Sequence, residues 1–209
     1  MSDSVEPERM CRAVCGARAA VAAGKRNAAM VAIAGPRPTP WLYGDRLRLG
    51  GRDWRVWTGN GHAAEHLTLW SEDDDLVIAG DQLLPGISPN LGVYATEPGA
   101  NPVADWLESC DRFAALAEDR HLVLPGHKLP YTGLPARLVQ LAENHRTALD
   151  RLAASLAERP RTAADCFDLL YRRRIGEGEY GLALAEAIAH VNALAAAGRW
   201  EGKLVHRTR

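Results

Sequence analysis

Short apolar runs separated by turn residues fill the stretch between residues 45 and 80, and this pattern constrains the fold more than any other feature of the chain. A glycine pair at 50–51 and an acidic run at 72–75 interrupt the apolar runs, as turns do in an antiparallel or mixed sheet. We expect the acidic run to be a solvated turn. The pattern predicts strands at 46–49, 54–57, 67–70 and 76–79, and a fifth at 122–124.

The character of the sequence changes near residue 133, where alanine- and leucine-rich stretches with helical periodicity begin. Helices are predicted at 5–23, 102–119, 135–158, 163–171 and 179–197. Several prolines and glycines mark 24–40 as a connecting loop. We therefore expect three parts: an N-terminal helix and linker (1–40), a β-rich part (41–133) and a helical domain (134–209).

The composition is that of a soluble globular protein, with 47% hydrophobic and 24% charged residues and a formal net charge of -1 over 209 residues. This charge argues against a nucleic acid or an anionic membrane as a partner. No apolar run has the length of a membrane span, and the acidic start does not resemble a secretory signal, so a cytoplasmic location is predicted. The four cysteines are expected to be free thiols packed as small apolar groups: Cys11, Cys15, Cys110 and Cys166.

Three residues that commonly bind metals occupy equivalent places, each directly after a glycine where a predicted strand ends: His62, Asp81 and His127. Neighbouring strands would bring these positions to a common sheet edge, where loops hold side chains over a cleft. Two imidazoles and a carboxylate suit Zn²⁺ or a similar divalent ion. The residues alone leave a plainer interpretation open, in which the histidines are structural and Asp81 caps a turn.

Three motifs then resemble the later motifs of the metallo-β-lactamase superfamily and stand in the order of that family: Gly-His-Ala-Ala-Glu-His at 61–66, Gly-Asp-Gln-Leu at 80–83 and Pro-Gly-His at 125–127. The stretch 135–200 is similar to the winged-helix-like domain that follows the hydrolase fold in one branch of the superfamily. The resemblance implies an α+β fold, with half of an αβ/βα sandwich over 41–133 and a small helical, winged-helix-like domain after it.

The resemblance also implies a site. By match, His62 binds one zinc, His127 binds the other, and Asp81 bridges the two, whereas His66 supports the site without binding metal. An intact relative would hydrolyse an ester, thioester, amide or phosphodiester bond of a small-molecule substrate. The catalytic role falls to Asp81 together with the metals.

The chain departs from the family at its chief motif, His-x-His-x-Asp-His, which does not occur in the sequence. The seven histidines are His62, His66, His121, His127, His145, His190 and His206, and no two have the i,i+2 spacing. We therefore expect a truncated chain that begins within a domain, binds Zn²⁺ partially or not at all, and has little activity. Another chain could complete the site, which leaves homo-oligomerisation open.

A competing hypothesis is a non-catalytic remnant that binds a partner or nucleic acid through residues 135–209. Two further histidines are assigned plainer roles. His121 is expected to pack beside a strand, and His145 is expected to be exposed on an amphipathic helix.

Overall fold

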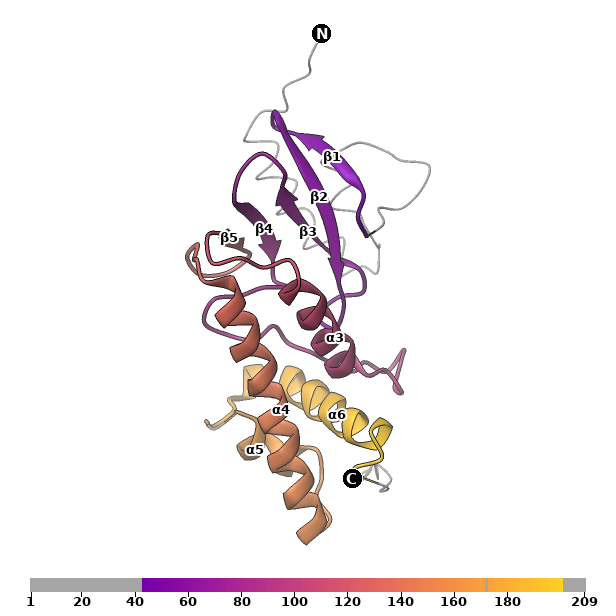
Figure 1. The fold of residues 1–209 in the computed structure, drawn as a ribbon. Helices are drawn as coiled ribbons and strands as arrows, with labels where there is room; N and C mark the ends of the chain where they lie inside the picture. The colour runs from indigo at the N-terminus through magenta and orange to yellow at the C-terminus, as the bar shows by residue number, and fades with distance from the viewer. Residues whose placement is uncertain (1–42, 172, 201–209) are drawn as a thin grey trace. The chain divides into compact units, whose positions relative to one another are not determined.

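The computed structural model describes residues 43–171 and 173–200, which form two compact units (Figure 1). The sheet unit contains the described residues up to Ile87 together with Ala117–Pro135. The helical unit contains Ser88–Leu116 and the described residues from Ala136 onward. The predicted helix at 5–23, with Cys11 and Cys15, lies outside the described residues. The fold is mixed α+β, as the sequence predicts.

Five strands form one sheet in the order β1-β2-β3-β4-β5 (Figure 1). They are β1 (Arg46–Leu49), β2 (Arg52–Gly59), β3 (His66–Ser71), β4 (Leu76–Gly80) and β5 (Leu122–Pro125). The first four pair antiparallel, and β5 pairs parallel with β4. All five predicted strands are confirmed. β2 extends further at both ends than expected because β1 pairs with its first half and β3 with almost its whole length.

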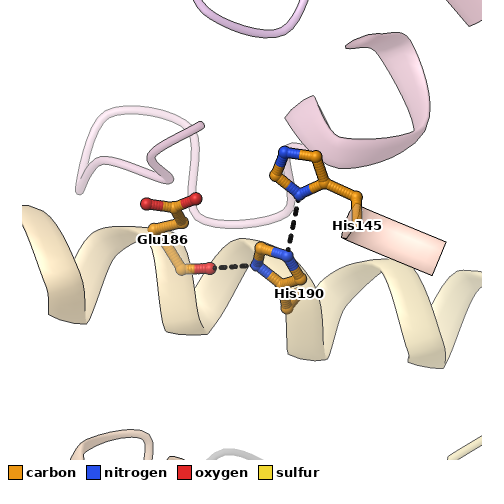
Figure 2. A group of neighbouring side chains, drawn as sticks. All are labelled: His145, Glu186 and His190. Carbon is orange, nitrogen blue, oxygen red and sulfur yellow. Dashed lines mark hydrogen bonds between the residues drawn. The ribbon is translucent and has the colours of Figure 1, made fainter. Parts of the chain in front are cut away.

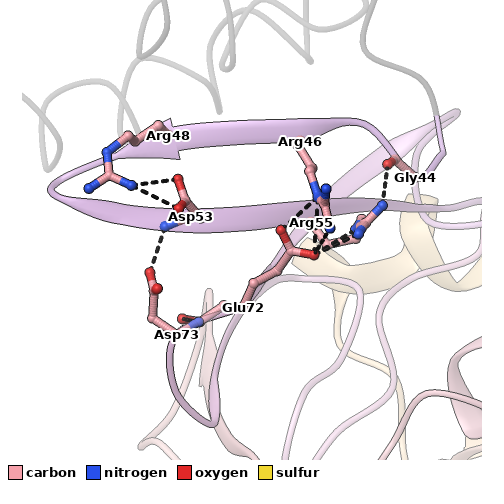
Figure 3. Close-up of polar contacts among 8 residues, drawn as sticks. Gly44, Arg46, Arg48, Asp53, Arg55, Glu72 and Asp73 are labelled. Atoms are coloured by element: carbon pink, nitrogen blue, oxygen red, sulfur yellow. Dashed lines mark hydrogen bonds and ion pairs between the residues drawn. The ribbon is translucent and has the colours of Figure 1, made fainter.

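One face of the sheet carries an apolar cluster, and exposed ion pairs stabilise the hairpins. Leu49, Trp54, Val56 and Leu69 are buried together, and the Trp54 indole N–H donates to the Leu49 carbonyl at 3.0 Å. Figure 3 shows Glu72, at the start of the acidic run, accepting hydrogen bonds from both Arg46 and Arg55. These guanidinium groups hold the pKa of Glu72 below its ordinary value. The acidic run is the solvated turn that the sequence predicts.

The helical unit contains α3 (Pro102–Ala114), α4 (Leu134–Glu158, from Ala136 onward), α5 (Phe167–Tyr171) and α6 (Tyr180–Ala196), with short 3₁₀ turns before α5 and α6. The prediction that α3 runs to residue 119 is wrong. Its buried face ends at Phe113, and the chain leaves the helical unit at Ala117, so no packing surface supports another turn. No helix among the described residues is long and apolar enough to cross a membrane. The winged-helix detail stays a prediction.

Two side-chain amides hold the long loop that precedes α3 against α6. Asn90 Nδ2 donates to the Leu182 carbonyl at 3.3 Å, and Asn192 Nδ2 donates to the Ala100 carbonyl at 2.8 Å. These bonds explain why the loop and α3 belong to the helical unit, although they precede residue 133 in the sequence. The chain therefore passes between the units at three points rather than at one boundary.

The two described cysteines provide a test of this packing. Cys110 and Cys166 are buried free thiols, and burial raises the pKa of Cys110 to about 12. Since the thiolate is the reactive form, we expect neither residue to be alkylated by iodoacetamide in the native protein at pH 8. Both should be modified after unfolding in guanidinium chloride, and peptide mass spectrometry distinguishes the two states. Rapid native alkylation of Cys110 would contradict the packing of α3.

Candidate metal centre

Strand direction brings the three predicted site residues to one edge of the sheet. β2 and β4 both run antiparallel to β3, and β5 runs parallel to β4, so β2, β4 and β5 all point the same way. His62, Asp81 and His127 each follow the end of one of these strands. His66 opens β3 at the same edge, where it pairs with Gly59.

Asp81 lies between two imidazoles, each of which faces a different oxygen of its carboxylate. His127 Nε2 is 3.4 Å from Oδ1, and His62 Nε2 is 3.7 Å from Oδ2. The side chains of His62, Asp81 and His127 are 28%, 25% and 40% exposed, so solvent and small molecules can reach them. The structure thus brings together the three residues that the sequence singles out.

Two glycines explain how the backbone comes this close to the site. A Cβ built at Gly126 would lie 2.2 Å from Asp81 Oδ1, so any side chain there would displace the carboxylate. Gly80 has a φ of +54°, and a Cβ there would lie 2.8 Å from the His66 ring. The β4–β5 register shifts at Gly80, and the Gly126 N–H donates to the Gly80 carbonyl at 2.7 Å. Glycine directly before each ligand-type residue is therefore a steric requirement at these two positions.

Gln82 also supports the site, although the sequence analysis did not identify it as a site residue. Its buried side chain lies over Gly59, where a Cβ would approach the amide to 2.4 Å, and Nε2 donates to the Asn60 carbonyl at 3.3 Å. The Asn60 side chain in turn accepts from the Glu65 N–H at 2.8 Å. Residue 82 thus ties the loop that carries His62 to the loop that carries Asp81. The only sequence signal was its position directly after Asp81.

The electrostatics of the site favour a charged Asp81 carboxylate and a neutral His66 ring. The His62 imidazole beside it, with a further contribution from His127, holds the pKa of Asp81 below its ordinary value. Burial, with the neighbouring His62, lowers the pKa of His66 to about 4, so this ring is neutral at physiological pH. His66 Nδ1 lies 3.1 Å from the Leu67 carbonyl, which can only accept, so the proton is on Nδ1.

The donor set fits divalent zinc. Ligand atoms on one tetrahedral zinc lie about 3.3 Å apart for bonds of about 2 Å, close to the separation between His127 and Asp81. The ligand atoms of His62, Asp81 and His127 do not all lie within 4.8 Å of one another. A different group of three residues within the described part of the chain does meet this criterion. One ion held by His62, Asp81 and His127 together therefore fits less well than two positions that share Asp81.

That other group is His145, Glu186 and His190 in the helical unit. The prediction that His145 is exposed is wrong, since only 5% of it is accessible. Its neighbours at Leu141, Ala148 and Leu152 are buried as well, so it lies on the buried face of α4. The i,i+4 spacing of Glu186 and His190 was the available sequence signal.

Comparison with known proteins identifies relatives of this chain. Residues 149–205 match the family model described as metallo-beta-lactamase-like, C-terminal domain. A solved beta-lactamase domain protein from Burkholderia ambifaria is 38% identical, with a TM-score of 0.73 over 91% of this chain and 56% of that one. The probable metallo-hydrolase YqjP of Bacillus subtilis (strain 168) is 29% identical over 160 residues, 73% of this chain and 49% of that protein. These comparisons all indicate the metallo-β-lactamase superfamily.

The hydroxyacylglutathione hydrolase of Methylobacterium sp. (strain 4-46) is 34% identical over 116 residues. That match covers 56% of this chain and 41% of the relative. The chain thus spans about half the length, or less, of the two protein relatives it matches.

The glycine before His127 offers a direct test of the site. In Gly126→Ala the new methyl group collides with Asp81 Oδ1. We expect zinc affinity, measured by titration calorimetry, to fall by about tenfold or more, as it does when support for a metal ligand is lost. Gly86→Ala is the matched control, since a Cβ there meets nothing within 4 Å. Equal zinc affinity in both variants would exclude Asp81 as a ligand.

Proposed function

We propose that this chain contributes part of a dinuclear zinc site of a hydrolase, in which Asp81 bridges two positions, His62 serves one and His127 serves the other. The observation that carries the proposal is that the two carboxylate oxygens of Asp81 face different imidazoles, at 3.7 Å and 3.4 Å. Resemblance to the metallo-β-lactamase superfamily supports the same assignment.

Bound zinc would make water a better nucleophile near neutral pH, and it would stabilise the negative charge that develops on the attacked group. The residues of this chain would hold the metal ions and keep the metal-binding side chains oriented. His62 and His127 present imidazole nitrogen donors on either side of Asp81, whose pKa is lowered so that the carboxylate stays ionised. Glycine at 126 and the Gln82 bridge keep these donors in place. The substrate would be a small molecule with an ester, thioester, amide or phosphodiester bond, and the name of the Methylobacterium relative favours a thioester.

The number of protein ligands at each position determines how tightly zinc is expected to bind. A catalytic zinc usually has three protein ligands and one open position. In this chain each proposed position has two, because the His-x-His-x-Asp-His motif does not occur in its sequence. We therefore propose that the chain alone binds zinc weakly and turns over little substrate.

The alternative of a nucleic-acid module has less support. Residues 172–174 are the arginine run that would contact phosphate, and both terminal nitrogens of Arg173 bond to Glu179, at 2.8 Å and 2.7 Å. An arginine paired in this way has little left to offer a phosphate.

Single substitutions should separate the bridging residue from the terminal ligands. Asp81→Asn removes the shared charge, so zinc should be lost from both positions, whereas His127→Ala should weaken only one. Equilibrium dialysis with zinc followed by elemental analysis gives the number of weakly bound ions. Any hydrolysis of a generic thioester should fall with Asp81→Asn by about 100-fold or to background, since the metals supply the nucleophile.

Asp119→Asn is the matched control, because Asp119 is an exposed carboxylate of the same unit. The proposal would be wrong if Asp81→Asn and Asp119→Asn bound equal amounts of zinc. Tight binding of two zinc ions with enzyme-like turnover by the unaltered chain would contradict the ligand count.

A further inference from the structure

A second cluster of ligand-type residues lies inside the helical unit, separate from the Asp81 site. His145 comes from α4, and Glu186 and His190 come from α6, one helical turn apart (Figure 2). One ligand atom from each residue lies within 4.8 Å of the other two. All three residues are buried, with 5%, 9% and 2% of their surfaces exposed.

Hydrogen bonds fix which nitrogens are available. His190 Nδ1 lies 2.8 Å from the backbone carbonyl of Glu186, which can only accept, so Nδ1 carries the proton and Nε2 has the lone pair (Figure 2). That lone pair faces His145 Nδ1 at 3.1 Å. A protein group that holds the far nitrogen of a histidine and aims the near one is the usual support of a metal-binding imidazole.

The separation of these nitrogens matches a shared ion as well as a shared proton. Two ligands of one tetrahedral zinc lie about 3.3 Å apart. Burial lowers the pKa of His145 to about 3, and burial together with the nearby Arg151 charge lowers that of His190, so both rings are neutral. An ion at Nδ1 requires the His145 proton to be on Nε2, the buried nitrogen that has no hydrogen-bond partner among the described residues.

Glu186 is a buried carboxyl group that lacks a cationic partner among the described residues. Its Oε2 accepts from the Tyr171 hydroxyl at 3.0 Å and from Asn90 Nδ2 at 3.0 Å, and both donors are neutral. No ion pair within the described part of the chain includes Glu186. Buried carboxylates are normally paired with a positive charge or coordinate a metal. Burial without such a charge raises the pKa of Glu186 to about 7.

We propose that His145, Glu186 and His190 bind a divalent transition-metal cation of the zinc class through Nδ1, a carboxylate oxygen and Nε2. Two imidazoles and one carboxylate are a protein donor set known for zinc, which takes one further ligand such as water. Because the three ligands are buried, the ion is structural and crosslinks α4 to α6. Through its Asn90 bond, Glu186 also links the ion to the loop before α3.

The test uses the full chain with the first site removed by His62→Ala, Asp81→Ala and His127→Ala. The protein is stripped with a chelator, incubated with zinc alone and desalted. We expect about one zinc per chain by elemental analysis and a melting temperature that rises with zinc. Adding Glu186→Gln should abolish both effects. Since the first site is absent, failure of the Asp81 proposal cannot produce this result.

Glu186→Gln keeps the volume and a hydrogen-bond acceptor for Tyr171 and Asn90. If Glu186 had a packing role alone, this substitution would not change the amount of zinc that the protein retains. Glu158→Gln, at an exposed glutamate of α4, is the matched control and should retain the zinc. The proposal is overturned if the first-site variant retains no zinc, or if Glu186→Gln retains as much as Glu158→Gln. Should Glu186→Gln fail to fold by circular dichroism, His190→Gln decides by the same two readouts.

Discussion

The candidate metal centre depends on the parallel pairing of β4 with β5. This pairing places the ends of both strands at one edge, and the register shift at Gly80 lets the Gly126 amide bond the Gly80 carbonyl at 2.7 Å. The Asp81 carboxylate then occupies the space that a side chain at residue 126 would fill. The imidazoles of His62 and His127 approach a carboxylate whose position is already set by backbone, so the site is largely organised before a ligand arrives.

The two clusters of ligand-type residues differ in burial, and burial decides what each can do. His62, Asp81 and His127 keep a quarter or more of their side-chain surface exposed, so a substrate can reach a metal held there. His145, Glu186 and His190 are almost fully enclosed, and α4 and α6 provide all three. An ion in the second cluster would contribute to folding rather than to turnover. The same chain thus offers donors for a reactive position and for a structural one.

Sequence patterns predicted the sheet because alternation and turn residues are local signals. The glycine before each of the three ligand-type residues pointed to the edge of the sheet where they lie. The bridge from Gln82 to Asn60 could not be predicted, since it joins loops that meet only when β2 and β4 flank β3. His145 was misplaced because a histidine counts as polar in a helical pattern, although its neighbours on that face are apolar. The end of α3 depends on where the chain leaves the helical unit, and no local sequence pattern indicates where that is.

The most direct test of the account is anomalous diffraction at the zinc edge from crystals of the unaltered chain soaked in excess zinc. The account predicts a peak on each side of the Asp81 carboxylate, one about 2 Å from His127 Nε2 and the other about 2 Å from His62 Nε2. Excess zinc is needed because each position has two ligands from this chain. The absence of any peak within bonding distance of Asp81, at a zinc concentration that fills other sites in the crystal, would contradict its role as the bridging ligand.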